Sequence, residues 1–102
     1  MKNSFELIYS PEFYKDLNDI INYIKYELKN IIAANNLIDK VEKEINNRMK
    51  NPLNFEKYKT KSGNTYYRLY VKNYIIFYIV FEDKITIRRI IYKKIYDKKY
   101  LK

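Results

Sequence analysis

Cysteine and histidine are both absent from this chain of 102 residues. The lack of cysteine excludes disulfides, thiolate zinc sites and cysteine nucleophiles. The lack of histidine removes the most common general acid–base residue and the most common ligand of transition metals. Without histidine, no serine of the chain can be activated as in a serine triad, so this mechanism is excluded. We therefore expect neither a metal nor a cofactor.

Glycine and long apolar runs are scarce too. The single glycine, Gly63, cannot form a glycine-rich phosphate-binding loop. No apolar run approaches the roughly 20 residues of a membrane span, and the N-terminus lacks the apolar region of a signal peptide. Because a chain without cysteine is compatible with a reducing compartment, we expect a cytoplasmic protein with no membrane partner.

Basic residues are abundant and unevenly distributed. The net charge is +9, and residues 84–102 contain eight basic residues and one acid, whereas residues 1–83 contain 13 basic and 11 acidic residues. Apolar residues make up 47% of the chain, which is enough for the core of one domain over residues 1–102. A nearly neutral body with a basic end indicates an anionic partner, either nucleic acid or an acidic protein segment. The alternative is a lysine-rich tail that only aids solubility.

Residues 65–92 organise the expected fold. They form three runs of β-branched and aromatic residues, separated by polar breaks at 72–73 and 82–84. This composition predicts a three-stranded antiparallel meander. The middle run, residues 74–81, is apolar on both faces, which is typical of a central strand or of one that is covered on both sides.

A strand and two helices are expected before the meander. Residues 5–9 alternate as a short strand, and Ser10-Pro11 supplies an N-cap and a first-turn proline for a helix. Asn30 is a second N-cap, and Asn51-Pro52 ends the second helix. The two apolar stripes are Phe13, Leu17, Ile20, Ile21, Ile24 and Leu28, and then Ala34, Leu37, Ile38, Val41, Ile45 and Met49. The helices should form an antiparallel hairpin packed on one sheet face, and the fold class is α+β.

Two polar segments complete the chain. Residues 53–64 are lysine-rich, and we predict that they form a mobile loop. Residues 93–102 are basic and aromatic, with a short helix and a short strand as open alternatives. Tyr96, Tyr100 and Leu101 are spaced so that one side of this tail can dock on the sheet. We therefore predict that the tail belongs to a target-facing surface and contributes little to the core.

The residues that remain for chemistry are cationic and phenolic. They are Arg68, Arg88, Arg89, Lys93 and Lys94, with Tyr66, Tyr70, Tyr92, Tyr96 and Tyr100. Such a set binds phosphates and stacks bases. RNA cleavage needs a base for the 2′-hydroxyl, a cation for the phosphorane and an acid for the leaving oxygen. Lysine, arginine and tyrosine fill those roles when their pKa values are perturbed. The alternative is that the tyrosines are ordinary sheet and rim residues.

The order of strand, helical hairpin, meander and basic tail resembles the RelE/ParE superfamily of bacterial type II toxin–antitoxin toxins. In the first half the resemblance is carried by Tyr9-Ser10-Pro11, Asp16-Leu17, Ile20, Tyr23-Ile24, Leu28, Asn30, Ala33-Ala34, Leu37, Ile45 and Asn51-Pro52. In the second half it is carried by Tyr67-Arg68-Leu69, Val71, Asn73-Tyr74, Ile76-Phe77-Tyr78, Val80, Arg89-Ile90, Tyr92, Asp97 and Leu101. The ordered set over nearly the whole chain carries the resemblance, since no single piece is a strong motif.

The resemblance implies a small toxin that is neutralised by an acidic antitoxin. RelE-like members cut mRNA in the ribosomal A site, whereas ParE-like members inhibit DNA gyrase and are not nucleases. The long helical hairpin is similar to that of ParE-like proteins. In RelE-like proteins an arginine for the scissile phosphate stands at the position of Ile75, a lysine pair at Arg68 and Tyr70, and a tail arginine at Ile95. These departures favour the ParE-like branch.

We therefore predict a ParE-like toxin that poisons DNA gyrase, binds a cognate acidic antitoxin and reaches operator DNA only through that antitoxin. One alternative is an mRNA interferase, a ribosome-dependent endonuclease acting on ribosome-bound mRNA through Arg68, Lys93, Lys94 and Tyr96. Another is a regulatory member that binds antitoxin without being toxic. The predicted target-binding residues are Arg68, Arg88, Arg89, Tyr92, Lys93, Lys94, Tyr96, Lys98 and Lys99.

Overall fold

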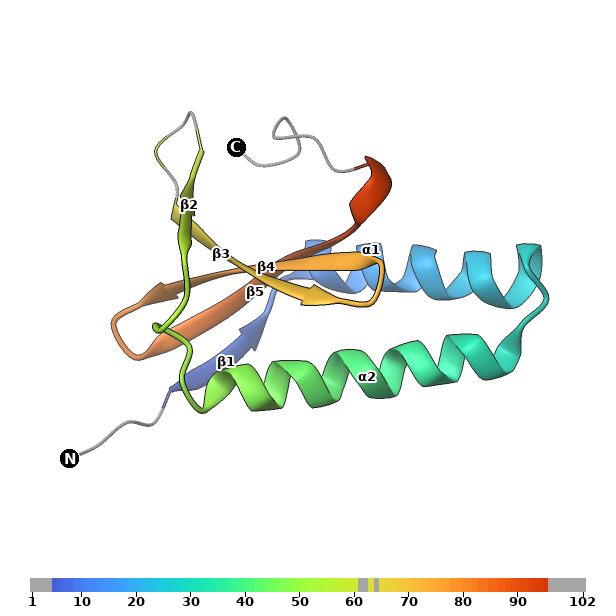
Figure 1. Cartoon of the computed structure of the whole chain (residues 1–102), viewed down its shortest axis with the longest axis horizontal. Helices are drawn as coiled ribbons and strands as arrows, with labels where there is room; N and C mark the ends of the chain where they lie inside the picture. Colours follow the sequence, from blue (N-terminus) through green and yellow to red (C-terminus); the bar gives the residue numbers. More distant parts are fainter. Residues whose placement is uncertain (1–4, 61–62, 64, 96–102) are drawn as a thin grey trace.

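The computed structural model of the chain describes residues 5–60, 63 and 65–95. The predicted order of a strand, two helices and an antiparallel meander is confirmed, and the fold is α+β (Figure 1). The first half contains β1 (Glu6–Tyr9), α1 (Pro11–Asn22), a π-helical turn (Tyr23–Glu27) and α2 (Ile31–Met49). The second half contains β2 (Lys57–Lys59), β3 (Thr65–Val71), β4 (Tyr74–Phe81), β5 (Lys84–Tyr92) and a 3-10 turn (Lys93–Ile95).

The strands form one mixed five-stranded sheet in the order β1-β5-β4-β3-β2. The meander β3-β4-β5 is antiparallel, and β4 lies between two neighbours, as its two apolar faces predict. The N-terminal strand β1 pairs with β5 in parallel. A parallel pair needs a long connection, and here the chain between β1 and β5 contains the helical hairpin and the strands β2, β3 and β4.

The expectation of a loop over residues 53–64 is wrong in its middle. Residues Lys57–Lys59 form β2, which pairs antiparallel with β3 at the sheet edge. A strand of three residues is too short to show a period-2 pattern in sequence. Its central residue, Tyr58, packs against the apolar cluster of Tyr66 and Phe77, and this long-range contact holds the segment in place.

Both helices begin where their capping residues predict. The Ser10 hydroxyl accepts a hydrogen bond from the Phe13 N–H, and Pro11 occupies the first helical position. The Asn30 side chain accepts from the Ala33 N–H at the start of α2. The Ser10 hydroxyl also donates to the Arg88 carbonyl, so the same cap ties α1 to β5.

The first helix ends differently from the prediction. Its last turn, Tyr23–Glu27, is π-helical, and the Leu28 N–H donates to the Tyr23 carbonyl five residues earlier. The wider turn changes the angle between successive side chains. Leu28, expected in the apolar stripe with Ile24, is therefore turned outward and is 56% exposed, while Ile24 remains buried.

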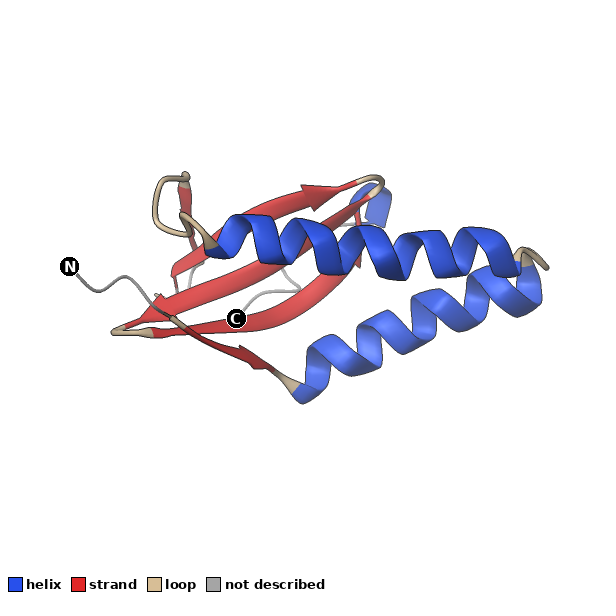
Figure 2. Cartoon of the chain, turned by 90° about the horizontal axis from the view of Figure 1, so that it is seen from below, coloured by secondary structure: helices blue, strands red, loops and turns tan. Residues whose placement is uncertain are grey.

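The two helices run in opposite directions across one face of the sheet, which we call the helix face (Figure 2). The main core lies between them and the strands. Its buried members include Phe13 and Ile21 of α1, Leu37, Val41 and Ile45 of α2, and Leu69, Ile76, Tyr78, Ile85, Ile87 and Ile90 of the meander. Burial of this apolar surface is the dominant stabilising contribution, as the two amphipathic stripes predict.

The sheet face that is turned away from the helices is called the distal face. It carries alternate residues of the meander, and Tyr66, Ile75, Phe77 and Ile91 form a second, smaller apolar cluster there. This cluster is separate from the main core because side chains alternate between the two faces along each strand. The docking predicted for residues 96–102 lies outside the described residues.

Candidate target-binding site

Arg68 lies on the distal face in the middle of β3. Its neighbours Tyr67 and Leu69 point to the helix face and are buried in the main core. The Arg68 guanidinium lies over the ring of Tyr58 in β2, 5.0 Å from the ring centroid. The flanking strand, which was not expected from the sequence, therefore supplies the platform on which this cation rests.

A second cation rests on a tyrosine at the end of the same face. Tyr70 follows Arg68 by two residues in β3, so both point to the distal face. The Lys93 ammonium lies 5.7 Å from the centroid of the Tyr70 ring, which is 53% exposed. The Lys93 N–H donates to the Asn73 carbonyl at 2.7 Å, which holds the start of the 3-10 turn beside the β3–β4 connection.

These cations lack acidic partners within the part of the chain that the structure describes. None of Arg68, Arg88, Lys93 and Lys94 forms an ion pair with a carboxylate of the described residues. Lys93 and Lys94 are exposed, and Arg68 and Arg88 are half-buried. Two cations stacked on tyrosines can bind phosphate or carboxylate groups that approach the distal face.

Arg89, another predicted target-binding residue, is engaged at the sheet edge. Its Nε and Nη2 donate to the two oxygens of Asp16 in α1, at 2.6 and 2.9 Å. Asp16 Oδ2 also accepts from the Ile90 N–H at 3.1 Å. The pairing of β1 with β5 ends at Ile87, so the backbone of β5 beyond that point has no partner in β1. Asp16 supplies an acceptor for one of its N–H groups, that of Ile90. Arg89 thus joins α1 to the sheet.

Arg88 occupies a β-bulge. Phe77 pairs with Arg89 and Tyr78 pairs with Ile87, so Arg88 is the extra residue of β5. The bulge shifts the alternation of side chains, which lets both Ile87 and Ile90 reach the main core. The sequence places Arg88 in a strand correctly, but it does not reveal the bulge.

Tyr92 is brought to a different place from Arg68. It pairs with Tyr74 across β4 and β5, and the two ring centroids are 5.5 Å apart. Burial raises the pKa of the Tyr74 phenol, and the nearby Tyr92 and Tyr23 phenols raise it further. Since Tyr74 packs against the main core, this tyrosine pair belongs to the helix face. Tyr96, Lys98 and Lys99 lie outside the described residues.

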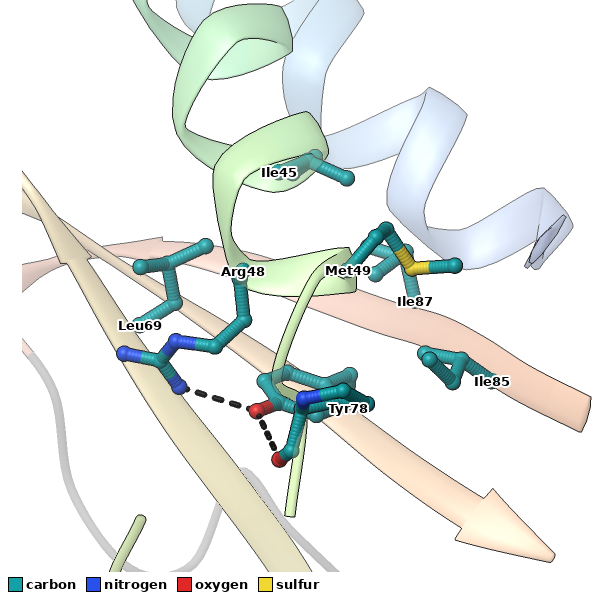
Figure 3. A pocket seen from close by; sticks show the side chains of 8 residues that line it. Ile45, Arg48, Met49, Leu69, Tyr78, Ile85 and Ile87 are labelled. Carbon is teal, nitrogen blue, oxygen red and sulfur yellow. Dashed lines mark hydrogen bonds between the residues drawn. The ribbon is translucent and has the colours of Figure 1, made fainter. Parts of the chain in front are cut away.

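Arg48 is a residue that sequence reasoning missed. It stands in the last turn of α2, and its Nη1 donates to the Tyr78 hydroxyl at 2.9 Å (Figure 3). The same Nη1 also donates to the Arg68 carbonyl at 3.2 Å. The Tyr78 hydroxyl in turn donates to the Pro52 carbonyl at 2.8 Å. The Arg48 guanidinium also stacks on Phe55, 3.4 Å from the ring centroid. No short-range pattern could reveal these partners, which lie up to 30 residues away.

The pocket beside Arg48 is a packing feature of the core. It is lined by Ile45, Arg48, Met49, Pro52, Leu69, Tyr78, Ile85 and Ile87 (Figure 3). Burial raises the pKa of the Tyr78 phenol, an effect that the hydrogen bond and charge of Arg48 partly offset. Arg48 therefore fixes the segment after α2 and, through the Arg68 carbonyl, the strand that presents Arg68.

Among the residues that the structure describes, no group of three or more aspartate or glutamate residues is placed to hold a metal ion. None of the helices in that part of the chain is long and apolar enough to cross a membrane.

Comparison with known proteins supports a family relationship. Residues 7–95 match the family model described as the ParE toxin of the type II toxin–antitoxin system parDE. The fold is similar to that of a chain from the chromosomal ParDE system of P. aeruginosa, with a TM-score of 0.71 and 13% identity over 89% of this chain and 98% of that one.

A second solved structure has a higher sequence identity to this chain and a lower TM-score. It is the RelB-RelE antitoxin-toxin complex from Methanococcus jannaschii, with 29% identity, a TM-score of 0.48, and coverage of 85% of this chain and 91% of that one. No curated protein matches the chain.

Proposed function

Because the chain belongs to the ParE toxin family of type II toxin–antitoxin systems, we propose that it inhibits growth by poisoning DNA gyrase until a cognate acidic antitoxin neutralises it. The family match spans residues 7–95 and so includes both helices and all of the sheet except Glu6 of β1. Gyrase is the target that the resemblance implies for the ParE-like branch. In this proposal the toxin reaches operator DNA only through its antitoxin, and it acts in the cytoplasm.

The buried Ile75 is the observation that supports gyrase over mRNA. This residue stands where the resemblance places the phosphate-binding arginine of RelE-like nucleases. Its side chain is 2% exposed and packs against Tyr66, Phe77 and Ile91 on the distal face. A cation at that point would have to be buried without an acidic partner, which is costly. Ile75 therefore serves packing. A cleavage site of the RelE-like kind would lack the cation that this position supplies.

The distal face fits the acidic part of an antitoxin. Arg68 and Lys93 rest on Tyr58 and Tyr70, and carboxylates of the described residues do not neutralise them. In complexes of this kind apolar anchors supply most of the affinity, while charged pairs at the rim set the association rate and salt dependence. We propose that antitoxin carboxylates meet these two cations.

A direct test uses gyrase and translating ribosomes side by side. We expect the purified toxin to inhibit supercoiling by gyrase, and pre-incubation with antitoxin to restore it. The same preparation should leave ribosome-bound mRNA intact, because loss of one transition-state cation costs about 10²–10³ in rate.

Two results would contradict the proposal. Cleavage of mRNA in the A site that disappears in Arg68→Ala would favour the mRNA interferase. Binding of antitoxin without inhibition of gyrase, translation or growth would indicate a regulatory member.

A further inference from the structure

The cation at Arg68 is supported by two segments of the chain. Its backbone belongs to β3, whereas its guanidinium lies over the Tyr58 ring of β2, 5.0 Å from the ring centroid. β2 has three residues, lies at the end of the sheet order and pairs with β3. Strands this short form few hydrogen bonds and are marginally stable by themselves. The position of the Tyr58 ring therefore depends on contacts other than strand pairing.

Arg48 contacts both of these segments. Its Nη1 donates to the Arg68 carbonyl at 3.2 Å, which ties it directly to β3. Its guanidinium lies over the Phe55 ring, 3.4 Å from the centroid and two residues before β2 begins. A third contact runs through the Tyr78 hydroxyl, which accepts from Nη1 and donates to the Pro52 carbonyl (Figure 3). One side chain at the end of α2 thus holds β3 and the segment that leads into β2.

The contacts of Arg48 depend on the shape of its guanidinium. A planar guanidinium stacks on an aromatic ring while its N–H groups donate to acceptors, a combination that the ammonium of a lysine cannot reproduce. Arg48 is half-buried, and it forms no ion pair with a carboxylate of the described residues. Its partners among those residues are two oxygen acceptors and the rings of Phe55 and Tyr78. Such partners suit a side chain that fixes the relative position of neighbouring segments.

Stabilisation of the core alone does not account for this arrangement. The hydrogen bond to Tyr78 satisfies a buried hydroxyl, which is a structural role. The contacts with the Arg68 carbonyl and with Phe55 lie outside the main core, and Phe55 is 44% exposed. They reach the two segments that carry the Arg68 guanidinium and the Tyr58 ring beneath it. Arg48 therefore acts on the distal face from its place beside the core pocket.

We propose that Arg48 is a positioning residue for the cation site that Arg68 and Tyr58 form on the distal face. By holding β3 and the segment before β2 together, it sets the orientation in which the Arg68 guanidinium meets an antitoxin carboxylate. This inference rests on the proposed function, under which antitoxin carboxylates bind the distal face. Because Arg48 acts through Arg68, its loss should impair association with the antitoxin only while Arg68 is present.

The test is a double-mutant cycle of Arg48→Ala and Arg68→Ala in the full chain. Stopped-flow association rates with the purified cognate antitoxin are measured at several salt concentrations. We expect each single variant to associate about three- to tenfold more slowly than the wild type at low salt. The double variant should associate no more slowly than Arg68→Ala alone. If Arg48 instead contacted the antitoxin itself, the two losses would multiply.

Arg48→Lys separates the position of the guanidinium from its charge. This variant keeps the charge and one donor group but loses the planar stack on Phe55. We expect it to keep most of the slower association of Arg48→Ala. Full recovery of the wild-type rate in Arg48→Lys would assign the effect to long-range attraction by the charge. The lysine variant also carries the cycle if Arg48→Ala does not fold.

Ile45→Ala controls for a general loss of stability. Ile45 is 2% exposed and lines the same pocket as Arg48, and its truncation removes no hydrogen bond (Figure 3). We expect this variant to melt at a lower temperature and to associate with the antitoxin at the wild-type rate. A purely structural role for Arg48 predicts instead that Ile45→Ala and Arg48→Ala slow association equally.

Amide hydrogen exchange in the toxin alone gives a readout that needs no antitoxin. In Arg48→Ala the amides of β2 should exchange faster than in the wild type, while those of β4 keep wild-type rates. In Ile45→Ala the amides of β2 should gain no more than those of β4. Equal acceleration of β2 and β4 in Arg48→Ala would show that Arg48 stabilises the whole fold and positions nothing.

Each remaining outcome also decides the matter. Multiplied losses in the cycle, or association of Arg48→Ala at the wild-type rate, overturn the inference. If Arg68→Ala itself associates as fast as the wild type, the antitoxin contact in the proposed function fails. The exchange rates of β2 then still decide whether Arg48 holds the Tyr58 ring in place.

Discussion

The two faces of the sheet are built from the same strands and differ in what they bury. On the helix face, Leu69 and Ile76 pack against two amphipathic helices in one extended core. On the distal face, Ile75 and Phe77 form a smaller cluster bordered by Arg68. The period-2 alternation of β3 and β4 separates the two environments residue by residue.

The difference shows how one short meander can combine stability with binding. The main core lies on the helix face, so the distal face can carry Arg68 and Lys93, which form no ion pair with a carboxylate of the described residues. Arg48 connects the two, because its guanidinium reaches the Tyr78 hydroxyl in the core and the carbonyl of Arg68. Substitutions on the two faces should therefore separate loss of folding from loss of binding.

The largest expected effect is on the helix face. Ile45→Ala removes a side chain that is 2% exposed and lines the core between α2 and the sheet. We expect a loss of about 2–5 kcal/mol in the free energy of unfolding, since the cavity cannot fully close. Ile79→Ala on the distal face, where the residue is only half-buried, should cost about 1 kcal/mol. Equal losses in urea unfolding would contradict the division of roles between the faces.

Tyr78→Phe tests the link from core to distal face and should have a smaller effect. The variant keeps the ring but leaves the Pro52 carbonyl without the Tyr78 donor and removes one of the two acceptors of Arg48 Nη1. We expect a loss of about 1–2 kcal/mol at neutral pH. Tyr67→Phe, on the neighbouring strand, is a matched control that also keeps its ring stacked on position 78.

The difference in stability between the wild type and Tyr78→Phe depends on pH in a defined way. The pKa of the Tyr78 phenol is raised above its ordinary value of 10.0, chiefly by burial. Below that pH both folded and unfolded chains keep the proton, so stability does not change. Above it the unfolded chain binds fewer protons than the folded one, so stability falls as pH rises. The gap between wild type and Tyr78→Phe should therefore narrow above pH 10, and a gap that widens there would refute the assignment.

The elements that the sequence predicted well depend on neighbouring residues. The bounds of the meander follow from its polar breaks, and the helix starts follow from Ser10 and Asn30, whose partners are three residues away. Patterns of this kind can be recognised within a single window of about ten residues. The resemblance to the toxin superfamily also depended on this local order, and the family match confirmed it.

The features that were missed depend on residues far apart in the chain. Arg89 looked available for a target because Asp16, 73 residues earlier, gives no sign in sequence of reaching it. The strand β2 exists because Tyr58 packs on the distal cluster, and the exposure of Leu28 follows from a single π-helical turn. In each case tertiary contacts or backbone geometry outweighed the local pattern.

The smallest expected effect on stability is at Arg68. Arg68→Ala removes the cation stacked on Tyr58 and should cost only about 0.5–1 kcal/mol in the free energy of unfolding. Because its charge has no acidic partner among the described residues, the loss should appear instead in antitoxin binding, as a slower association and a weaker dependence on salt. Lys15→Ala is the charge-matched control, since Lys15 lies on α1 and pairs with Asp19. Stopped-flow association rates at several salt concentrations measure both variants, and a salt dependence in Arg68→Ala no weaker than in Lys15→Ala would show that the antitoxin's carboxylates bind away from the distal face.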